Sequence, residues 1–259
     1  MKIAACVEYN GTAYCGWQRQ HHAPSVQEEV EKALSKIANE AITIRCAGRT
    51  DTGVHGIGQV IHFETEVERN NRAWQMGTNT HLPYDITLRW VSPVAEDFHA
   101  RFSALSRHYR YVILNRDSRS ALLHQQVCWH RPPLDSSQMN QAAQALLGRH
   151  DFTSFRAIAC QAPHAMREVY AIKVQREGMF IYIDIQANAF LHHMVRNIVG
   201  SLLLIGQGKQ DIDWMSYLLK QKNRALAGAT ASASGLYFIA VDYPEKFQLD
   251  IPPILPRFS

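Results

Sequence analysis

The chain has 259 residues, of which 46% are hydrophobic and 19% charged, and its formal net charge is +4 at neutral pH. This composition is that of a globular protein and excludes a largely disordered chain. The five cysteines are scattered without any C-x-x-C pair, which argues against a disulfide framework or a structural zinc site and favours a reducing cytoplasm. Glu8 interrupts the N-terminal apolar run, and the later apolar run at 201–206 is far too short to span a bilayer, so we expect no signal peptide and no membrane partner.

The first half of the chain is predicted to follow the order β-α-β-β-α-β. Its first helix is expected to begin after Ser25, whose hydroxyl can cap the first turn while Glu28, three residues on, completes a capping box. A glycine-rich loop joins the second and third strands. The expected elements are a strand over 2–9, a helix from 26, strands over 41–47 and 58–65, a helix over 71–82 and a strand over 86–94.

The second half repeats this order more loosely. Asp135 is expected to cap its first helix, and a hairpin is expected to turn at residues 176–178. The expected elements are a strand over 106–115, a helix over 135–148, the hairpin over 167–187, helices over 190–205 and 211–221, and a strand over 235–243. The proline-rich tail that follows is expected to pack as an irregular arm.

These patterns predict an α+β fold built from two pseudo-repeated β-α-β-β-α-β halves with mostly antiparallel sheets. We expect an N-terminal domain over residues 1–104 and a C-terminal domain over residues 105–259. Helices would cover one face of the sheets. The open face would form a central cleft suited to an extended ligand.

Arginine is concentrated in residues 101–131, which contain six Arg, no Lys and one acidic residue, Asp117. Such a stripe suits the phosphate backbone of a nucleic acid. A solvated strand face with long arginine side chains accounts equally well for the same composition. Both interpretations stay open on composition alone.

Asp51 is the one carboxylate in the loop GRTDTGVHGIG, where four glycines allow tight backbone turns. An isolated Asp-Thr-Gly triplet most often caps neighbouring amides in a turn. Aspartic proteases carry the triplet but need a second, matching carboxylate motif, which this sequence lacks. A glycoside hydrolase would likewise need two carboxylates across one cleft.

Other catalytic classes also lack part of their pattern. His62 and Glu64 match the H-x-E of zinc deaminases, but the P-C-x-x-C half is missing. The pairs His21–His22 and His192–His193 resemble metal sites only superficially. Neighbours on a helix point about 100° apart, so the second pair is expected to place one histidine in the core and one on the surface. Glycine motifs for nucleotide cofactors are absent, and we expect no metal and no cofactor.

Five segments together resemble the tRNA pseudouridine synthases of the TruA family. They are YNGTAYCGWQRQ, AGRTDTGVHGIGQVIHF, ARFSALSRHYRYVI, ANAFLHHMVRNIVGSLL and SGLYFIAVDYP, and they span residues 9–244 in the family's order. The resemblance implies isomerisation of uridine to pseudouridine at positions 38–40 in the anticodon arm of tRNA. It also implies a cytoplasmic homodimer without metal or organic cofactor, and a central cleft that binds RNA.

The resemblance further implies roles for particular residues. Asp51 is the expected catalytic carboxylate, and Arg49 is expected to contact RNA and assist base extrusion. Tyr109 is expected to stack on the target base. Arg196 is expected to pair with the carboxylate, and Leu236 to form an apolar wall.

The chemistry of the isomerisation is consistent with this set. The base must leave its sugar, rotate while bound and rejoin through C5, so the site has to exclude water. One carboxylate can act as the nucleophile or as the base that removes a sugar proton, and both roles stay open. An arginine partner would keep that carboxylate ionised. We expect phosphate contacts from the arginines of 101–131 and from Arg19, Gln20 and His21.

The alternative from another class is an RNA-binding protein without catalytic activity, because arginines among aromatic side chains can serve binding alone. Asp51 discriminates between the two hypotheses. RNA binding should survive removal of this carboxylate, whereas catalysis should not.

Overall fold

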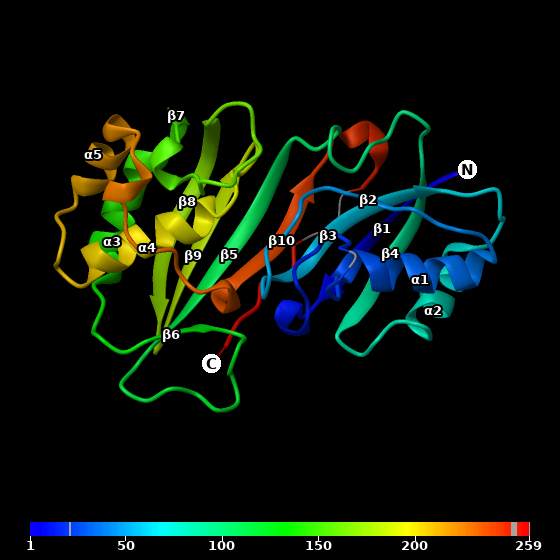
Figure 1. The fold of residues 1–259 in the computed structure, drawn as a ribbon, viewed down its shortest axis with the longest axis horizontal. Helices are drawn as coiled ribbons and strands as arrows, with labels where there is room; N and C mark the ends of the chain where they lie inside the picture. The colour runs from blue at the N-terminus through cyan, green and yellow to red at the C-terminus, as the bar shows by residue number, and fades with distance from the viewer. Residues whose placement is uncertain (21, 250–252, 259) are drawn as a thin grey trace. The chain divides into compact units, whose positions relative to one another are not determined.

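The computed structural model describes residues 1–20, 22–249 and 253–258. The chain forms two compact units, each described here by itself: unit 1 is Met1–Ser106 with Tyr237–Leu255, and unit 2 is Arg107–Leu236 with Pro256–Ser259 (Figure 1). His21, which the sequence analysis grouped with His22 and with the phosphate contacts, lies outside the described residues. Within the described part of the chain, no helix is both long and apolar enough to cross a membrane.

Unit 1 is an α+β unit with a mostly antiparallel sheet in the order β4-β1-β3-β10. Its strands are β1 (Lys2–Tyr9), β2 (Arg45–Cys46), β3 (His55–Glu64), β4 (Ile86–Val94) and β10 (Leu236–Asp242), the last of which belongs to the unit from Tyr237 on. The central strand β1 pairs antiparallel with both β3 and β4, and β2 pairs antiparallel with β3. The exception is β10, which runs parallel to β3 with Tyr237 beside His55.

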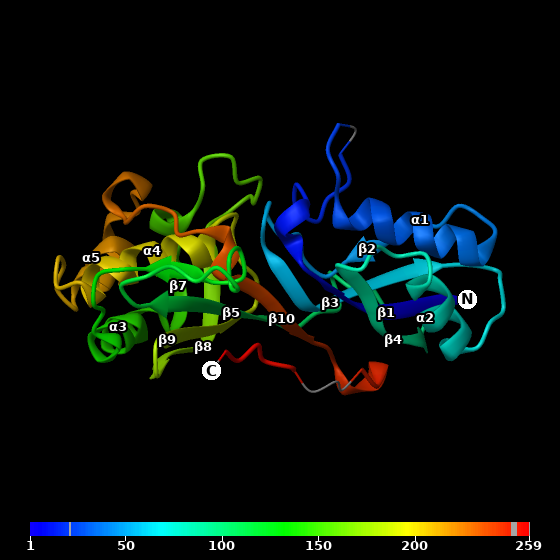
Figure 2. The ribbon, with the colours of Figure 1, turned by 90° about the horizontal axis from the view of Figure 1, so that it is seen from below.

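Two helices, α1 (Val26–Ala38) and α2 (Asn71–Asn79), cover one face of this sheet. Alternate residues of β1, from Ile3 to Tyr9, point into the core that these helices close, as expected for a strand with one buried face. The predicted cap is confirmed, because Ser25 Oγ accepts a hydrogen bond from the Glu28 N–H at 3.4 Å. In Figure 2, α1 lies above the sheet and the red C-terminal segment of the unit lies below it.

The predicted strands over 2–9 and 86–94 are confirmed, whereas the strand predicted over 41–47 is reduced to Arg45–Cys46. The reason is a tertiary contact with α1. The Ile42 N–H donates to Ser35 Oγ at 2.9 Å, and the Ile44 N–H donates to Glu31 Oε1 at 3.2 Å. Helix side chains therefore take the hydrogen bonds that a neighbouring strand would otherwise accept.

Unit 2 is also α+β, with an antiparallel sheet in the order β5-β9-β8-β7. Its elements are β5 (Ser106–Asn115), β6 (Cys128–His130), α3 (Ser136–Ala143), β7 (Gly148–Asp151), β8 (Met166–Glu177), β9 (Phe180–Ala187), α4 (Met194–Gly206) and α5 (Trp214–Gln221). The short strand β6 runs parallel to β5. Among the described residues there are also six 3₁₀ turns: Gly11–Ala13, Gln144–Leu146, Thr153–Phe155, Arg224–Leu226, Ala233–Gly235 and Glu245–Phe247.

Several predicted boundaries in the second half differ from the structure. The hairpin turns at Gly178 and Met179, with Gly178 at φ +57°, so residues 176 and 177 still belong to β8. The helix predicted from residue 190 begins at Met194, because His193 adopts a left-handed conformation at φ +61°. The α+β class with mostly antiparallel strands is confirmed.

Candidate active site

The loop between β2 and β3, residues 47–54, carries both Arg49 and Asp51. The Ala47 N–H donates to the Val60 carbonyl at 2.8 Å, which ties the start of the loop to β3. A tight turn follows, in which the Val54 N–H donates to the Asp51 carbonyl at 3.1 Å and Gly53 adopts φ +77°. A positive φ is accessible to glycine at little cost, so Gly53 allows the chain to reverse directly after Asp51.

Buried polar side chains hold the backbone on both sides of Arg49. Gln59 is fully buried, and its amide donates to the Gly48 carbonyl at 2.5 Å and accepts from the Gly48 N–H at 3.4 Å. Thr50 Oγ1 lies 2.8 Å from the Tyr9 hydroxyl, and burial raises the pKa of Tyr9 well above its usual value, so this phenol stays protonated. The loop thus presents an exposed Arg49 and a half-buried Asp51 from a fixed backbone.

The N-terminal loop, residues 10–17, packs directly on this turn. A Cβ atom at Gly11 would lie 1.9 Å from the Val54 carbonyl oxygen, and one at Gly16 would lie 2.7 Å from the Thr50 carbonyl oxygen. The Gly11 N–H also donates to Nδ1 of His55 at 3.1 Å. Two motifs that are separate in sequence, YNGTAYCGW and GRTDTGVHG, therefore form one structural element.

Sequence patterns did not predict the residues that hold this element together, namely Tyr9, Thr50, His55 and Gln59. One signal for Gln59 was present in the sequence, because it is an amide within the apolar strand that follows the loop. A buried amide of this kind normally has hydrogen-bonding partners. The partner here is backbone, which no side-chain pattern reveals.

Tyr109 lies on β5 of unit 2, opposite Ile185 of β9. The residue is 9% exposed, and its ring meets Phe190 edge to face with centroids 4.9 Å apart and an interplanar angle of 79°. This geometry is favourable for aromatic pairs and holds the tyrosine ring in one orientation.

Arg196 lies in the first turn of α4 and is half-buried. Its Nε donates to the Ala231 carbonyl at 2.8 Å, and the Ala231 N–H donates to the Arg196 carbonyl at 3.1 Å. The backbones of α4 and residues 228–231 approach closely, because a Cβ atom at Gly200 would lie 1.8 Å from the Ala229 carbonyl oxygen. Arg196 is therefore oriented by the backbone of a neighbouring segment.

Asn197, the next residue on α4, strengthens this contact. It is fully buried, and its side chain donates to the Phe155 carbonyl at 2.8 Å and accepts from the Thr230 hydroxyl at 2.7 Å. Leu236 ends the same stretch of chain. It is 5% exposed and begins β10 after the 3₁₀ turn Ala233–Gly235. Satisfied polar contacts of this kind hold residues 228–231 in one arrangement against α4.

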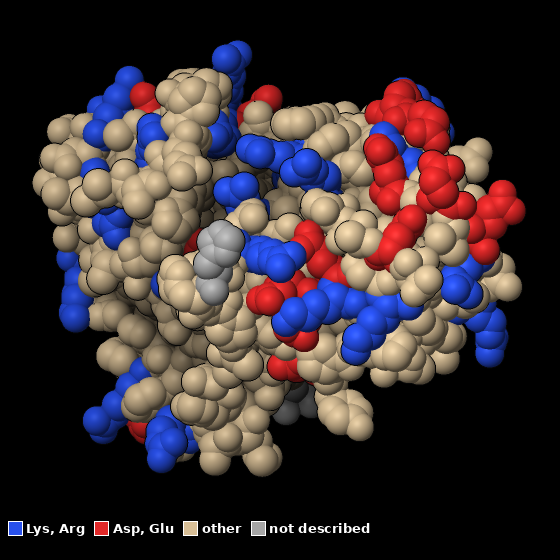
Figure 3. Space-filling model, turned by 45° about the vertical axis from the view of Figure 1, so that its right-hand side comes forward, with Lys and Arg blue, Asp and Glu red and all other residues tan. Residues whose placement is uncertain are grey.

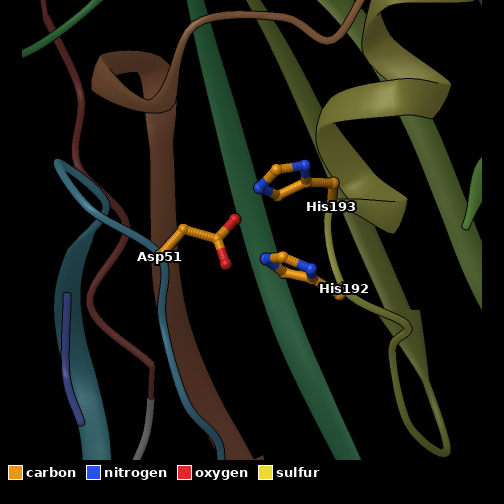
Figure 4. A group of neighbouring side chains, drawn as sticks. All are labelled: Asp51, His192 and His193. Carbon is orange, nitrogen blue, oxygen red and sulfur yellow. The ribbon is translucent and has the colours of Figure 1, made fainter. Parts of the chain in front are cut away.

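His192 and His193 precede α4 rather than lying on it (Figure 4). Their ring centroids are 4.0 Å apart, His192 is exposed and His193 is half-buried. The expectation of one core-facing and one surface histidine on a helix is therefore wrong, because the left-handed backbone of His193 brings the two rings together. Figure 4 also shows the carboxylate of Asp51 projecting from its loop in unit 1.

The arginines of residues 101–131 do not form one uniform surface. Arg101, Arg119 and Arg131 are exposed, whereas Arg110 is 1% exposed. The Arg110 guanidinium is bound by both carboxylate oxygens of Asp184, so the expected phosphate contact is wrong for this residue. Lys and Arg side chains also lie among Asp and Glu side chains on the face in Figure 3.

The expected site residues thus fall into two groups. Arg49 and Asp51 lie on one loop of unit 1, and Tyr109, Arg196 and Leu236 lie in unit 2. Of the expected phosphate contacts outside the arginine-rich region, Arg19 pairs with Glu31 at 3.2 Å and Gln20 donates to the Cys15 carbonyl at 3.0 Å.

Comparison with known proteins identifies the family. A family model described as tRNA pseudouridine synthase matches residues 5–103 and 142–244, which include four of the five site residues and leave Tyr109 between the matched ranges. A solved structure titled "Crystal Structure of a Cbf5-Nop10-Gar1 Complex" is similar with a TM-score of 0.37 and 15% identity, covering 91% of this chain and 48% of that chain. At this low similarity, nothing about the substrate or the assembly of that complex is transferred to this chain.

Curated relatives match over nearly their whole length. The tRNA pseudouridine synthase A of Hydrogenovibrio crunogenus is 58% identical over 247 residues, covering 95% of this chain and 94% of that protein. The proteins of the same name from Escherichia fergusonii and Klebsiella pneumoniae are each 56% identical over 257 residues, covering 99% of this chain and 95% of theirs. The chain therefore belongs to the tRNA pseudouridine synthase family, a family of isomerases.

Proposed function

We propose that this chain isomerises uridine to pseudouridine at positions 38–40 in the anticodon arm of tRNA, with Asp51 as the catalytic carboxylate. The reaction breaks the bond between N1 and C1′, forms a bond between C5 and C1′, and moves one proton from C5 to N1. No atom is gained or lost, so the proposal needs no co-reactant. The activity is supported by 58% identity to a curated tRNA pseudouridine synthase A across 95% of the chain.

The observation that carries the role of Asp51 is the rigid loop 47–54. Catalytic groups act best when they are held in place before the substrate arrives, since positioning then costs nothing during the reaction. Three features provide this support. They are the two hydrogen bonds between the Gln59 amide and Gly48, the contact of Thr50 with Tyr9, and the turn at Gly53. A half-buried carboxylate here can attack C1′ as a nucleophile or remove a sugar proton as a base.

We propose further that Arg49 contacts the RNA and assists extrusion of the target base. This arginine is exposed and lies two residues before Asp51. Extrusion of a base from a stacked arm costs a few kcal/mol, which protein contacts must offset. An exposed arginine beside the catalytic residue has the reach and charge for such a contact.

In unit 2, we propose that Tyr109 stacks on the extruded base, that Arg196 pairs with the catalytic carboxylate and that Leu236 is an apolar wall. The support is local rigidity. Tyr109 is braced by Phe190, and Arg196 is oriented by Ala231. Bound bases commonly stack on aromatic side chains.

The proposal includes a homodimer acting in the cytoplasm and a pseudo-repeat of the halves 1–104 and 105–259. Its support is the family membership and the similar make-up of the two units, each with a mostly antiparallel sheet and at least two helices, with residues 237–255 of the second half lying in unit 1. Sedimentation of the purified protein measures the oligomeric state directly.

The test compares the chain with its Asp51→Asn variant on an unmodified tRNA transcript labelled with tritium at C5 of uridine. Pseudouridine formation releases the C5 hydrogen, and mapping of the product locates the modified positions. Asp51→Asn is expected to lower the rate by at least about 10²- to 10⁴-fold, because it removes the carboxylate. Binding of tRNA, measured by titration, should persist because Asp51 supplies no attraction to a polyanion.

Asp97→Asn is the matched control. It removes one carboxylate from an exposed position in unit 1, where Asp97 pairs with Lys246 at 2.5 Å, and should leave the rate unchanged. If the unaltered chain binds tRNA but leaves every uridine unconverted across several tRNAs, the catalytic proposal fails and a binding protein takes its place. If Asp51→Asn keeps full activity, the carboxylate has been misassigned.

A further inference from the structure

The turn after β4 carries an exposed aromatic ring that contacts a histidine ring and an arginine. We call His99, Arg101 and Phe102, together with Arg45 of β2, the aromatic–basic patch; all four residues lie in unit 1. The Phe102 side chain is 76% exposed. Its ring lies 4.3 Å from the His99 ring with a tilt of 32°, and the Arg101 guanidinium lies 5.6 Å from its centroid.

The backbone under Phe102 is held firmly. Nδ1 of His99 accepts from the N–H groups of both Arg101 and Phe102, at 3.1 and 3.2 Å, so that nitrogen carries no proton. The Ser103 N–H donates to the His99 carbonyl at 2.9 Å, and the His99 N–H donates to Ser103 Oγ at 3.0 Å. Phe102 is therefore an exposed ring on a closed turn and does not lie on a loosely held loop.

The turn is also anchored to the sheet. The Ala100 N–H donates to Nδ1 of His62 on β3 at 3.1 Å, and the Tyr243 hydroxyl donates to the Ala100 carbonyl at 2.6 Å. His62 lies opposite Arg45 of β2, and its ring is 4.6 Å from that of His99. The patch thus adjoins β2, the strand that leads into the loop carrying Arg49 and Asp51.

The electrostatic environment of the patch is positive. Burial, followed by the charges of Lys2, Arg45 and Arg101, lowers the pKa of His99. Arg49 and Arg101 both act on Cys46 of β2, where they oppose the effect of burial, which raises the pKa of that thiol to about 11. Cys46 of β2 therefore lies within electrostatic reach of both Arg49, on the loop of Asp51, and Arg101, in the patch.

The combination of an exposed ring and arginines matches the recognition of unpaired RNA. Single-stranded bases stack on aromatic side chains and on guanidinium planes, while arginines bind the flanking phosphates. A protein partner is a poorer match, because stable protein interfaces need a much larger apolar area. In this segment the large exposed apolar side chains are Phe102 and Leu105, which offer far less apolar area than such an interface buries.

We propose that the aromatic–basic patch binds one unpaired nucleotide of the tRNA substrate, with its base stacked on Phe102 and its adjacent phosphates held by Arg101 and Arg45. The inference rests on the proposed function, since it assumes that tRNA is the substrate. It adds a binding position outside the group of Asp51, Arg49, Tyr109, Arg196 and Leu236. Phe102 is a positioning residue that holds the tRNA while Asp51 acts.

The test measures tRNA binding, KM and kcat for Phe102→Ala and Phe102→Tyr. Removal of one stacked base is expected to weaken tRNA binding roughly 5- to 100-fold, with a matching rise in KM and little change in kcat. Phe102→Tyr retains a ring and should restore binding. Tyr84→Ala is the matched control, because Tyr84 is a fully exposed aromatic residue of the same unit, and it should bind tRNA like the unaltered chain.

Arg101→Gln separates the phosphate contact from stacking. Loss of one contact should reduce the slope of log K against log salt by about 0.7–0.9. Binding is titrated with each variant combined with Asp51→Asn, so that the tRNA stays unmodified. If Phe102→Ala binds tRNA as well as the Tyr84→Ala control does, the stacking position is overturned.

A change in oligomeric state caused by Phe102→Ala would also overturn the inference, in favour of a contact between copies of the chain. Failure of the proposed function looks different. In that case the unaltered protein converts no uridine, while the effect of Phe102→Ala on RNA binding can still be measured.

Discussion

The ion pair between Arg110 and Asp184 predicts that Asp184→Asn destabilises unit 2. Arg110 is 1% exposed, and its Nε and Nη2 donate to the two carboxylate oxygens of Asp184 at 2.7 and 2.8 Å. Its guanidinium also lies 4.8 Å from the centre of the Tyr182 ring. Asparagine in place of Asp184 would leave this cation buried without a counter-charge. Lys173 of β8, which lies opposite position 184 of β9 in the strand register, adds a second positive charge.

The expected magnitude follows from burial. Removing one partner of a buried ion pair costs about 3–5 kcal/mol. The Asp184 side chain is 33% exposed, so water screens part of the effect and we expect a loss of about 3 kcal/mol. Arg110→Met should cost less, about 1–2 kcal/mol, because the carboxylate left behind can reach water. The double variant Arg110→Met with Asp184→Leu removes both charges and should be more stable than Asp184→Asn alone.

Calorimetry and hydrogen exchange measure this effect. At about 2–4 °C per kcal/mol, the melting temperature of Asp184→Asn should fall by about 6–12 °C. Hydrogen exchange in β5 and β9 should accelerate, since both strands carry the pair. Affinity for tRNA and its salt dependence should stay unchanged at temperatures where the variant is folded. The reasoning is refuted if Asp184→Asn is fully stable, or if Arg110→Met lowers the salt slope of tRNA binding in a folded protein.

Two further predictions concern unit 1. Gly58→Ala should destabilise the protein by about 3 kcal/mol, because its Cβ would lie 2.0 Å from the Ile239 carbonyl oxygen of β10. Gly77→Ala, whose Cβ would meet only the flexible end of Ile37 at 3.0 Å, is the control and should cost less in urea denaturation. Equal losses would mean that the approach of β3 and β10 is not the cause. His62, whose pKa is lowered to about 4 by burial and then by the charges of His99 and Lys2, binds its proton more readily in the unfolded chain. Stability should therefore decline as pH falls from about 6.5 towards 4, and His62→Asn should flatten this decline in denaturation curves recorded across that range. Identical pH profiles for the two proteins would contradict the role of His62.

Local patterns in the sequence predicted much of unit 1. The strands over 2–9 and 86–94 and the Ser25 cap follow from hydrophobic spacing and capping chemistry within a few residues. The resemblance of five segments taken together, including the one around Asp51, also predicted the family, which the comparisons confirm. The roles of the five site residues remain predictions from that resemblance.

Long-range contacts decided what the sequence could not. Residues 41–44 lost their strand to side chains of α1, Arg110 became an internal ion-pair partner, and β10 joined unit 1 beside β3. The loop at Asp51 is likewise held by tertiary contacts, namely the hydrogen bonds of Gln59 and the two close backbone approaches at glycine. Periodicity and capping act between neighbours in the chain and are visible in the sequence, whereas these outcomes depend on partners far apart in the chain, which only the folded structure brings together.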